Sequence, residues 1–445
     1  MDRRHYLAAL AAIVGAGCVG SETTPDQQSS DSPTQTTPDQ QPSTPTYEPP
    51  TDSPPGEFTS LPDPGLWEYD LPDRSARIAV GDELYIATNT TLACLSPSGD
   101  TTWTTDSTSN SYAVAEVYDL TVAKTTVYYT ARDAPQTGEI GAHRTASGEQ
   151  RWTTTLDRVP DTVIDVTKDT VFASESYDDP GEAPVFAFDA ETAEEQWRTF
   201  TGMDMGSAVS HGLCLVYSVV DGLTALDTAT GEVRWERTPG DEYGARLEVI
   251  DDTLCLFMDG TVHGYALPDG THRWEQSLSG DAGFVQRPPL GSAQAADLYI
   301  ADDRANLTAL NATTGEKQWT VTTHWGPEGY EGICLGTDSL FYHSGTALAS
   351  YDLVDGTRQW AHSLGSEYNA SGPFVGDGTL FLITQERNKE PSIKTFDTET
   401  GSRDWYVQLT TGDPSPPRIA GVFNEYAAFR TDTELVGLPI THSTT

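Results

Sequence analysis

Basic residues are scarce in this 445-residue chain, with 25 Lys and Arg against 67 Asp and Glu and a formal net charge of −42. Nucleic-acid binding needs clustered basic side chains that neutralise phosphates, so this composition excludes a nucleic-acid partner. The acidic residues are spread along the chain rather than gathered in one tail. The repulsion between these charges is removed at high salt, since the Debye length falls to about 3 Å at 1 M. The sequence therefore predicts a protein adapted to high salt.

Cysteine is also rare, and the five cysteines include no CxxC motif and no adjacent pair. This disfavours zinc–thiolate and dithiol chemistry. Cys94, Cys214, Cys255 and Cys334 stand singly in strand-like runs, where we expect small buried apolar residues. The nine histidines show no HxH, HxxxH or HExxH spacing, so no metal site is predicted.

Long apolar runs are absent except near the start, where Arg3 and Arg4 precede an apolar stretch that ends at Val19. That stretch is shorter than the ~20 residues needed to span a bilayer. The order Arg-Arg-x-x-Leu resembles the twin-arginine export signal, predicted over residues 1–17. Gly15-Ala16-Gly17 before Cys18 is similar to a lipobox, although Gly15 stands where Leu is usual. Cys18 is therefore the predicted lipidation site, and the alternative is an incidental cysteine.

Residues 18–65 begin with this cysteine and contain no Lys or Arg and few large apolar residues. A segment rich in Ser, Thr, Pro, Gln and Asp cannot bury enough surface to offset its chain entropy. We predict a disordered linker that tethers the rest of the protein to the membrane. Residues 441–445 are predicted to be a disordered tail.

What the chain does contain is a thirteen-residue motif that recurs eight times without change of length. It reads LTALDTATGEVRW from Leu223 and LTALNATTGEKQW from Leu307. The motif ends at tryptophans spaced 38 to 49 residues apart: Trp103, Trp152, Trp197, Trp235, Trp274, Trp319, Trp360 and Trp405. Self-similarity at this period in strand-like segments indicates sheets arranged radially, as in a β-propeller.

Each part of the motif has a physical interpretation. Its first half alternates apolar with small or polar residues, as a strand does, and position five is Asp or Asn in five copies. Position nine is Gly in seven copies, as expected where a turn needs a positive φ. Ala193 is the exception and predicts a turn that is strained or of another type. The Trp then begins the next strand and is expected to pack on the neighbouring blade.

The two ends of the repeat array predict how the ring closes. After Trp405 another unit begins but stops before any Trp, while Trp67 stands in a strand-like segment with no unit before it. Joining the two segments in one blade closes the ring without an exposed edge. We therefore predict an all-β fold, a propeller of eight or nine four-stranded blades over residues 66–440. An open solenoid is the alternative, but it would need polar caps at both ends.

The motif resembles the pyrrolo-quinoline quinone (PQQ) enzyme repeat, whose consensus is close to ALDxxTGxxxW; residues 225–235 read ALDTATGEVRW. Two kinds of protein share this repeat: quinoprotein dehydrogenases, and non-enzymatic scaffolds that include a bacterial lipoprotein assisting outer-membrane barrel assembly. Resemblance to the dehydrogenases implies a vicinal disulfide between adjacent cysteines near the cofactor, but this chain has no Cys-Cys pair. No cofactor is therefore expected, and PQQ-dependent oxidoreductase is the alternative function.

The sequence thus predicts a non-enzymatic, lipid-anchored scaffold on the extracellular face of the cell membrane. Its partner would be an envelope protein or polymer, and a carbohydrate-binding module remains open as a third interpretation. The acidic composition and export signal together point to a haloarchaeal cell surface. The candidate binding loop contains His324, Trp325 and Tyr330 in a Gly-rich stretch. Possible N-glycosylation sites are Asn89, Asn306, Asn311 and Asn369.

Overall fold

A computed structural model describes most of the chain beyond residue 51. The described residues are 52–57, 59–60, 66–72, 75–106, 116–134, 137–175, 183–239, 245–280, 282–286, 298–323, 331–344, 347–364, 371–376, 378–385, 390–409, 417–423 and 426–439. Within these ranges the chain forms strands and turns, and none of it forms an apolar helix long enough to cross a bilayer.

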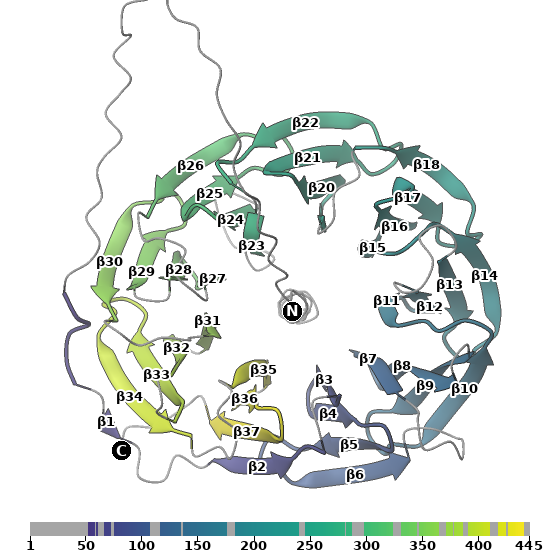
Figure 1. Ribbon diagram of the computed structural model, residues 1–445, viewed down its shortest axis with the longest axis horizontal. Helices are drawn as coiled ribbons and strands as arrows, with labels where there is room; N and C mark the ends of the chain where they lie inside the picture. Colours follow the sequence, from purple (N-terminus) through teal and green to yellow (C-terminus); the bar gives the residue numbers. More distant parts are fainter. Residues whose placement is uncertain are drawn as a thin grey trace, which may run out of the picture.

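These strands form nine antiparallel sheets arranged as the blades of a closed ring (Figure 1). From the centre outward, blades 1 to 3 are β3 (Arg77–Val80), β4 (Leu84–Ala87), β5 (Thr91–Leu95) and β6 (Thr101–Asp106); β7 (Glu116–Ala123), β8 (Thr126–Ala134), β9 (Thr137–Arg144) and β10 (Gln150–Leu156); and β11 (Thr162–Val166), β12 (Thr170–Ser174), β13 (Pro184–Asp189) and β14 (Glu195–Phe200). Blades 4 to 6 are β15 (Gly206–Ser210), β16 (Leu213–Ser218), β17 (Gly222–Asp227) and β18 (Val233–Arg237); β19 (Arg246–Ile250), β20 (Thr253–Met258), β21 (Thr261–Ala266) and β22 (His272–Ser277); and β23 (Ala282–Gln286), β24 (Leu298–Asp302), β25 (Asn306–Leu310) and β26 (Lys317–Thr322). Blades 7 and 8 are β27 (Glu331–Leu335), β28 (Ser339–Ser344), β29 (Ala347–Asp352) and β30 (Arg358–Ser363); and β31 (Ser371–Gly376), β32 (Thr379–Thr384), β33 (Ser392–Asp397) and β34 (Arg403–Gln408).

Blade 9 closes the ring with strands from both ends of the chain. It consists of β35 (Arg418–Phe423), β36 (Tyr426–Arg430) and β37 (Glu434–Pro439), with β2 (Trp67–Asp70) as its outer strand. In the antiparallel pair, Trp67 faces Gly437 and Asp70 faces Glu434. The predicted closure is confirmed, and of the two predicted blade counts, nine is the one formed by the described residues.

The apolar core lies between adjacent blades rather than at the centre of the ring. The second strand of each blade is mostly buried, and β16 is buried along its whole length, whereas on the outer strand β18 Trp235 is buried among exposed neighbours. Trp235 packs in one cluster with Leu215 and Tyr217 of its own blade and with Leu254 and Leu256 of the next. Each seam between blades is therefore a small, close-packed core of its own.

A further strand lies outside the ring. Strand β1 (Thr59–Ser60) pairs in parallel with β34, so that blade 8 has five strands (Figure 1). These residues fall within the segment predicted to be a disordered linker, but in the structure residues within 52–57 and 59–60 contact the ring. The physical reason is that an outer strand has unpaired backbone N–H and C=O groups, which an extended segment can satisfy.

Candidate functional site

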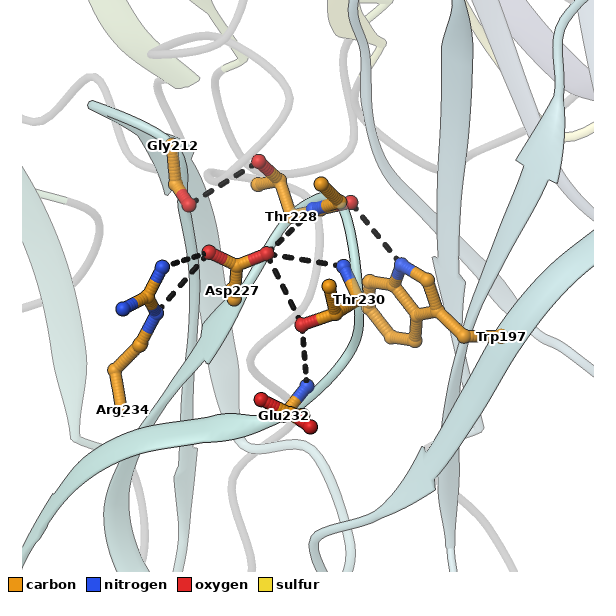
Figure 2. Close-up of polar contacts among 8 residues, drawn as sticks. Trp197, Gly212, Asp227, Thr228, Thr230, Glu232 and Arg234 are labelled. Carbon is orange, nitrogen blue, oxygen red and sulfur yellow. Dashed lines mark hydrogen bonds and ion pairs between the residues drawn. The ribbon is translucent and has the colours of Figure 1, made fainter.

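The turn between β17 and β18 shows how the repeated motif is held (Figure 2). Oδ1 of Asp227 accepts hydrogen bonds from the backbone N–H groups of Ala229 and Thr230 and from Thr230 Oγ1, at 3.0 to 3.1 Å. Oδ2 accepts from the guanidinium of Arg234. The hydrogen bond from Arg234, aided by the N–H groups of the turn, lowers the pKa of Asp227 below its usual value. A charged carboxylate therefore fixes the turn.

The same turn receives the indole of the preceding blade (Figure 2). Trp197 Nε1 donates to the carbonyl oxygen of Thr228 at 3.0 Å. Gly231 has a φ of +71°, and a Cβ added there would stand 2.6 Å from Cδ2 of Trp197. Glycine is thus needed both for the backbone conformation, as the sequence indicated, and to leave room for the ring, which the sequence did not reveal.

Equivalent contacts recur around the described part of the ring. The indole N–H groups donate to backbone carbonyls of the next blade at 2.7 to 3.2 Å in these pairs: Trp67 with Pro97, Trp103 with Thr145, Trp152 with Ala190, Trp235 with Leu267, Trp274 with Ala312, Trp319 with Leu353 and Trp360 with Thr398. Trp405 is buried in the seam with Val436 and Leu438 of blade 9. These tryptophans join neighbouring blades, so their role is structural.

Ala193 occupies the glycine position of the turn between β13 and β14. Its φ is +63°, close to that of Gly231, and its N–H donates to the carbonyl of Asp189 at 2.9 Å, as Gly231 does to Asp227 at 2.8 Å. The turn is therefore of the same type as the others. Of the two predicted alternatives, the strained turn is the one observed, because a side chain in the left-handed region costs free energy.

The outer edge of blade 8 is the clearest surface that accepts an extended segment. In the pairing of β1 with β34, Thr59 faces Trp405 and Ser60 faces Tyr406. The backbone N–H of Arg403 donates to the carbonyl of Pro55 at 2.8 Å. Nη1 of Arg403 donates to the carbonyls of Pro54 and Gly56, at 2.7 and 3.0 Å. Arg403 thus holds three consecutive residues of the added segment, two through its side chain and one through its backbone.

Two carboxylates near the centre of the ring, one on β7 and one just before β15, make a second set of contacts between blades. Asp119 on β7 accepts from the N–H groups of Leu120, at 2.9 Å, and of Val163 in the next blade, at 2.8 Å. Asp204 accepts from Ser174 Oγ at 2.5 Å and from the N–H of Gly206 at 2.8 Å. Burial is the main factor that raises the pKa of both carboxyls, against these hydrogen bonds. Their oxygens are engaged in joining blades.

The thiols do not fit the chemistry that the PQQ enzyme repeat implies. Cys94, Cys214, Cys255 and Cys334 lie on β5, β16, β20 and β27, in four different blades, and all four are buried. Burial raises the pKa of the Cys94 thiol to about 12, so it is an unreactive apolar residue. No vicinal disulfide can form from thiols on separate blades. The described residues therefore lack that part of a quinoprotein site.

The four predicted glycosylation sites differ in accessibility. Asn89 is exposed in a turn. Asn306 is buried, and its Nδ2 donates to both oxygens of Asp302 at 3.0 Å, so attachment of a glycan would require these bonds to break. The Oδ1 of Asn311 accepts from the N–H and Oγ1 of Thr314. Asn369 lies outside the described residues.

Other predicted site residues also lie outside the described part of the chain. These are the export signal Arg3 and Arg4, the lipidation site Cys18, and the candidate binding loop with His324, Trp325 and Tyr330. Conversely, the structure brings together His263, His272 and Glu275, a possible set of metal ligands that the motif search missed. They escaped it because they meet across a pair of strands rather than along one segment.

The ring and its repeated indole contacts define the protein as a nine-bladed β-propeller built from PQQ-like repeats. The chain belongs to the family described as outer membrane protein assembly factor BamB, whose sequence profile matches residues 136–288, 181–333 and 303–441. Among curated proteins, no match was found.

Three solved structures are similar at low sequence identity. BamB from Moraxella catarrhalis is 14% identical with a TM-score of 0.49, over 81% of this chain and 100% of that chain. The computationally designed Ika8 protein is 14% identical with a TM-score of 0.49, over 72% and 96%. The quinohemoprotein alcohol dehydrogenase ADHIIG from Pseudomonas putida HK5 is 13% identical with a TM-score of 0.46, over 87% and 79%. At these values the similarities carry no argument about function.

Proposed function

We propose that this propeller is a non-enzymatic scaffold that binds another protein or an envelope polymer along the outer edges of its blades. The observation that carries the proposal is the parallel pairing of β1 with β34, in which an extended segment adds to a blade through backbone hydrogen bonds. An extended peptide that adds to a sheet edge gains affinity from its main chain and specificity from its alternate side chains.

Apolar side chains on other outer strands support this assignment. Phe200 at the end of β14 is 56% exposed, and Val233 at the start of β18 is 47% exposed. A partner strand on either edge would cover such side chains while satisfying the backbone groups beside them. The description of the family as an outer membrane protein assembly factor is consistent with a surface of this kind.

Site-specific photo-crosslinking in intact cells tests the scaffold. A photoreactive residue replaces Thr155, Glu236 or Thr320, which are exposed on the outer strands β10, β18 and β26. We expect a discrete adduct with one partner from at least one edge position. Asp169, an exposed turn residue, is the control and should give none. Equal adducts from Asp169, or none from any edge, would contradict the proposal.

The same proposal places the protein on the outer face of the cell membrane, attached through a lipid on Cys18 after twin-arginine export. A diacyl anchor and the linker would hold the ring away from the bilayer. Cys18→Ser should therefore release the protein into the medium, measured by fractionation of cells and medium. Persistent membrane association of this variant would mean a different attachment.

The absence of a PQQ-dependent reaction is part of the proposal. Its support is the separation of the thiols onto four blades and the engagement of Asp119 and Asp204 in contacts between blades. Purified protein supplied with calcium and PQQ should give no dye reduction with alcohols or sugars. Reduction above the level without protein would favour the oxidoreductase alternative.

A further inference from the structure

Three possible metal ligands meet on the outer half of blade 5. His263 lies on β21, and His272 and Glu275 lie on β22. A ring nitrogen of each histidine and a carboxylate oxygen of Glu275 all lie within 4.8 Å of one another. This group lies away from the β1 pairing on blade 8.

The register of the two strands explains why these residues share one side of the sheet. His263 faces Glu275, and Tyr265 faces His272, with the pair of Gly264 and Trp274 between them on the ladder. Residues three apart on a regular strand point to opposite faces. Here the register shifts between these pairs, which leaves Arg273 as an extra residue. This β-bulge turns His272 to the same side as Glu275.

The three side chains differ in how far they can move. His263 is restrained by its partial burial, whereas His272 and Glu275 are exposed and can rotate. Tyr265 is buried in the seam with blade 4, and its ring meets that of His272 edge-on at 5.2 Å between centroids. The nearby guanidinium of Arg237 is occupied, since it donates to the carbonyls of Gly270 and Asp269 at 2.6 Å.

The fold itself does not require these three residues. The equivalent positions are Thr224, Val233 and Glu236 in blade 4, and Thr308, Lys317 and Thr320 in blade 6. Both of those blades keep the same turn and the same indole contact. Within the described residues, moreover, neither imidazole of the group nor the carboxylate of Glu275 makes a side-chain hydrogen bond. A structural role therefore does not account for the combination.

Two imidazoles and one carboxylate are the donor set of an open transition-metal site. Zinc bonds to histidine nitrogen and carboxylate oxygen are about 2.0–2.2 Å long, so the ligand atoms must draw closer than in the metal-free arrangement. Rotation of the exposed His272 and Glu275 side chains can supply that movement. Calcium and magnesium prefer oxygen ligands alone and fit this set poorly.

We infer that His263, His272 and Glu275 form a binding site for a divalent transition-metal ion such as Zn²⁺ or Cu²⁺, with solvent at the remaining coordination positions. The bound ion joins β21 to β22 beside the seam with blade 4. Because it binds only the folded hairpin, it raises the stability of the blade in proportion to the logarithm of its concentration.

Calorimetric titration of Zn²⁺ into the full, tag-free chain tests the site, in about 1 M NaCl so that the acidic surface is screened. We expect one saturable site in the wild type. His272→Ala should weaken its affinity by at least about 10-fold, the lower end of the loss when a supporting group is removed from a metal site. His272 is exposed, and an unchanged metal-free thermal midpoint will show that the variant is folded.

The matched control removes an imidazole elsewhere. His211 is exposed and has a φ of +52°, which asparagine tolerates, so His211→Asn should bind Zn²⁺ as the wild type does. With Cu²⁺, electron paramagnetic resonance should show coupling to two imidazole nitrogens in the wild type and to one in His272→Ala. The inference is overturned if no saturable site is found, or if His272→Ala binds as tightly as the wild type.

Discussion

At the scale of single residues, position nine of the repeated motif is constrained both by its left-handed backbone and by the nearby indole. At Gly231 the backbone is left-handed and the Trp197 ring lies against the Cα. At Ala193 a methyl group is tolerated in the same backbone conformation, and it packs in the cluster that contains Trp152. The native alanine thus shows that neither the conformation nor a neighbouring indole by itself excludes a methyl group, whereas at Gly231 an added Cβ would stand 2.6 Å from Cδ2 of Trp197 and would displace that ring.

Gly231→Ala should therefore be more disruptive than the backbone conformation alone suggests. A left-handed alanine costs about 1–2 kcal/mol, and displacement of Trp197 adds to it, so we expect a loss of about 2 kcal/mol or more. Ala193→Gly is the matched control. It relieves strain but increases the entropy of the unfolded chain, so its effect should stay within about 1 kcal/mol. Denaturant unfolding measures both, and equal effects would contradict the role of the indole.

A second residue-scale prediction concerns pH. The pKa of Asp227 is lowered in the folded state, so the ion pair with Arg234 adds stability above the unfolded-state pKa of about 3.9. That stability is lost as pH falls through the lower pKa of the folded protein. Asp227→Asn keeps an oxygen for the turn, as Asn311 does, but removes the ion pair. The difference in unfolding free energy between wild type and variant should be constant near neutral pH and shrink in acid.

Asp189→Asn is the control for this effect. Asp189 accepts the same turn hydrogen bonds from Glu191 and Thr192, but Gln196 stands at the position of Arg234. Its replacement should give a weaker dependence on pH at the same ionic strength. An Asp227→Asn difference that stays constant down to about pH 3, below the unfolded-state pKa, would show that the ion pair contributes nothing.

At the scale of elements, one side chain adds to the backbone contacts that attach residues 52–57 and 59–60 to the ring. Arg403→Ala removes the two hydrogen bonds from Nη1 to Pro54 and Gly56 but leaves the ring intact. We expect local opening of this segment to become easier by about 1–3 kcal/mol, read as faster amide exchange and proteolysis at residues 52–60. Lys317→Ala, at the equivalent position of blade 6, is the control and should leave this segment protected.

Sequence patterns anticipated strands better than the contacts between them. The motif from Leu223 to Trp235 predicted a strand, an Asx turn and a second strand, as β17 and β18 show. It could not reveal the bulge at Arg273, because a bulge depends on the register of two strands. Nor could it reveal β1, since Thr59 and Ser60 have no apolar pattern and pair mainly through their backbone.

At the scale of the whole molecule, the nine blades correspond to the eight complete motifs and one unit that is divided between the two ends of the repeat array. The prediction also allowed eight because rings of eight are the norm for this repeat, but Trp67 completes the last blade by pairing with Gly437. The candidate binding loop could not be judged in the same way. Its residues carry no repeat, so their sequence contains no information about which neighbours they meet.

Net charge is also a property of the whole molecule and predicts dependence on salt. A formal charge of −42 repels itself strongly when the Debye length is about 30 Å, as at 0.01 M ionic strength. At molar NaCl the repulsion is screened and burial at the seams dominates. The thermal midpoint should rise steeply with NaCl, and the near-UV circular dichroism lost in dilute buffer should return. Sucrose of equal osmolality, which screens no charge, is the control; an unchanged midpoint in NaCl would contradict the prediction.

The contacts of residues 52–57 and 59–60 with blade 8 also determine which part of the protein bears a mechanical force first. A pull on the chain from its N-terminal side reaches the carbonyls held by Arg403 and the short β1–β34 ladder first. Only after these have parted does the tension reach Trp67 and the β2–β37 pair that closes the ring. Forced unfolding is governed by the barrier of the element that bears the force. The contacts of Arg403 and the β1–β34 ladder on blade 8 therefore break first under load, and the N-terminal segment lengthens before the ring itself is strained.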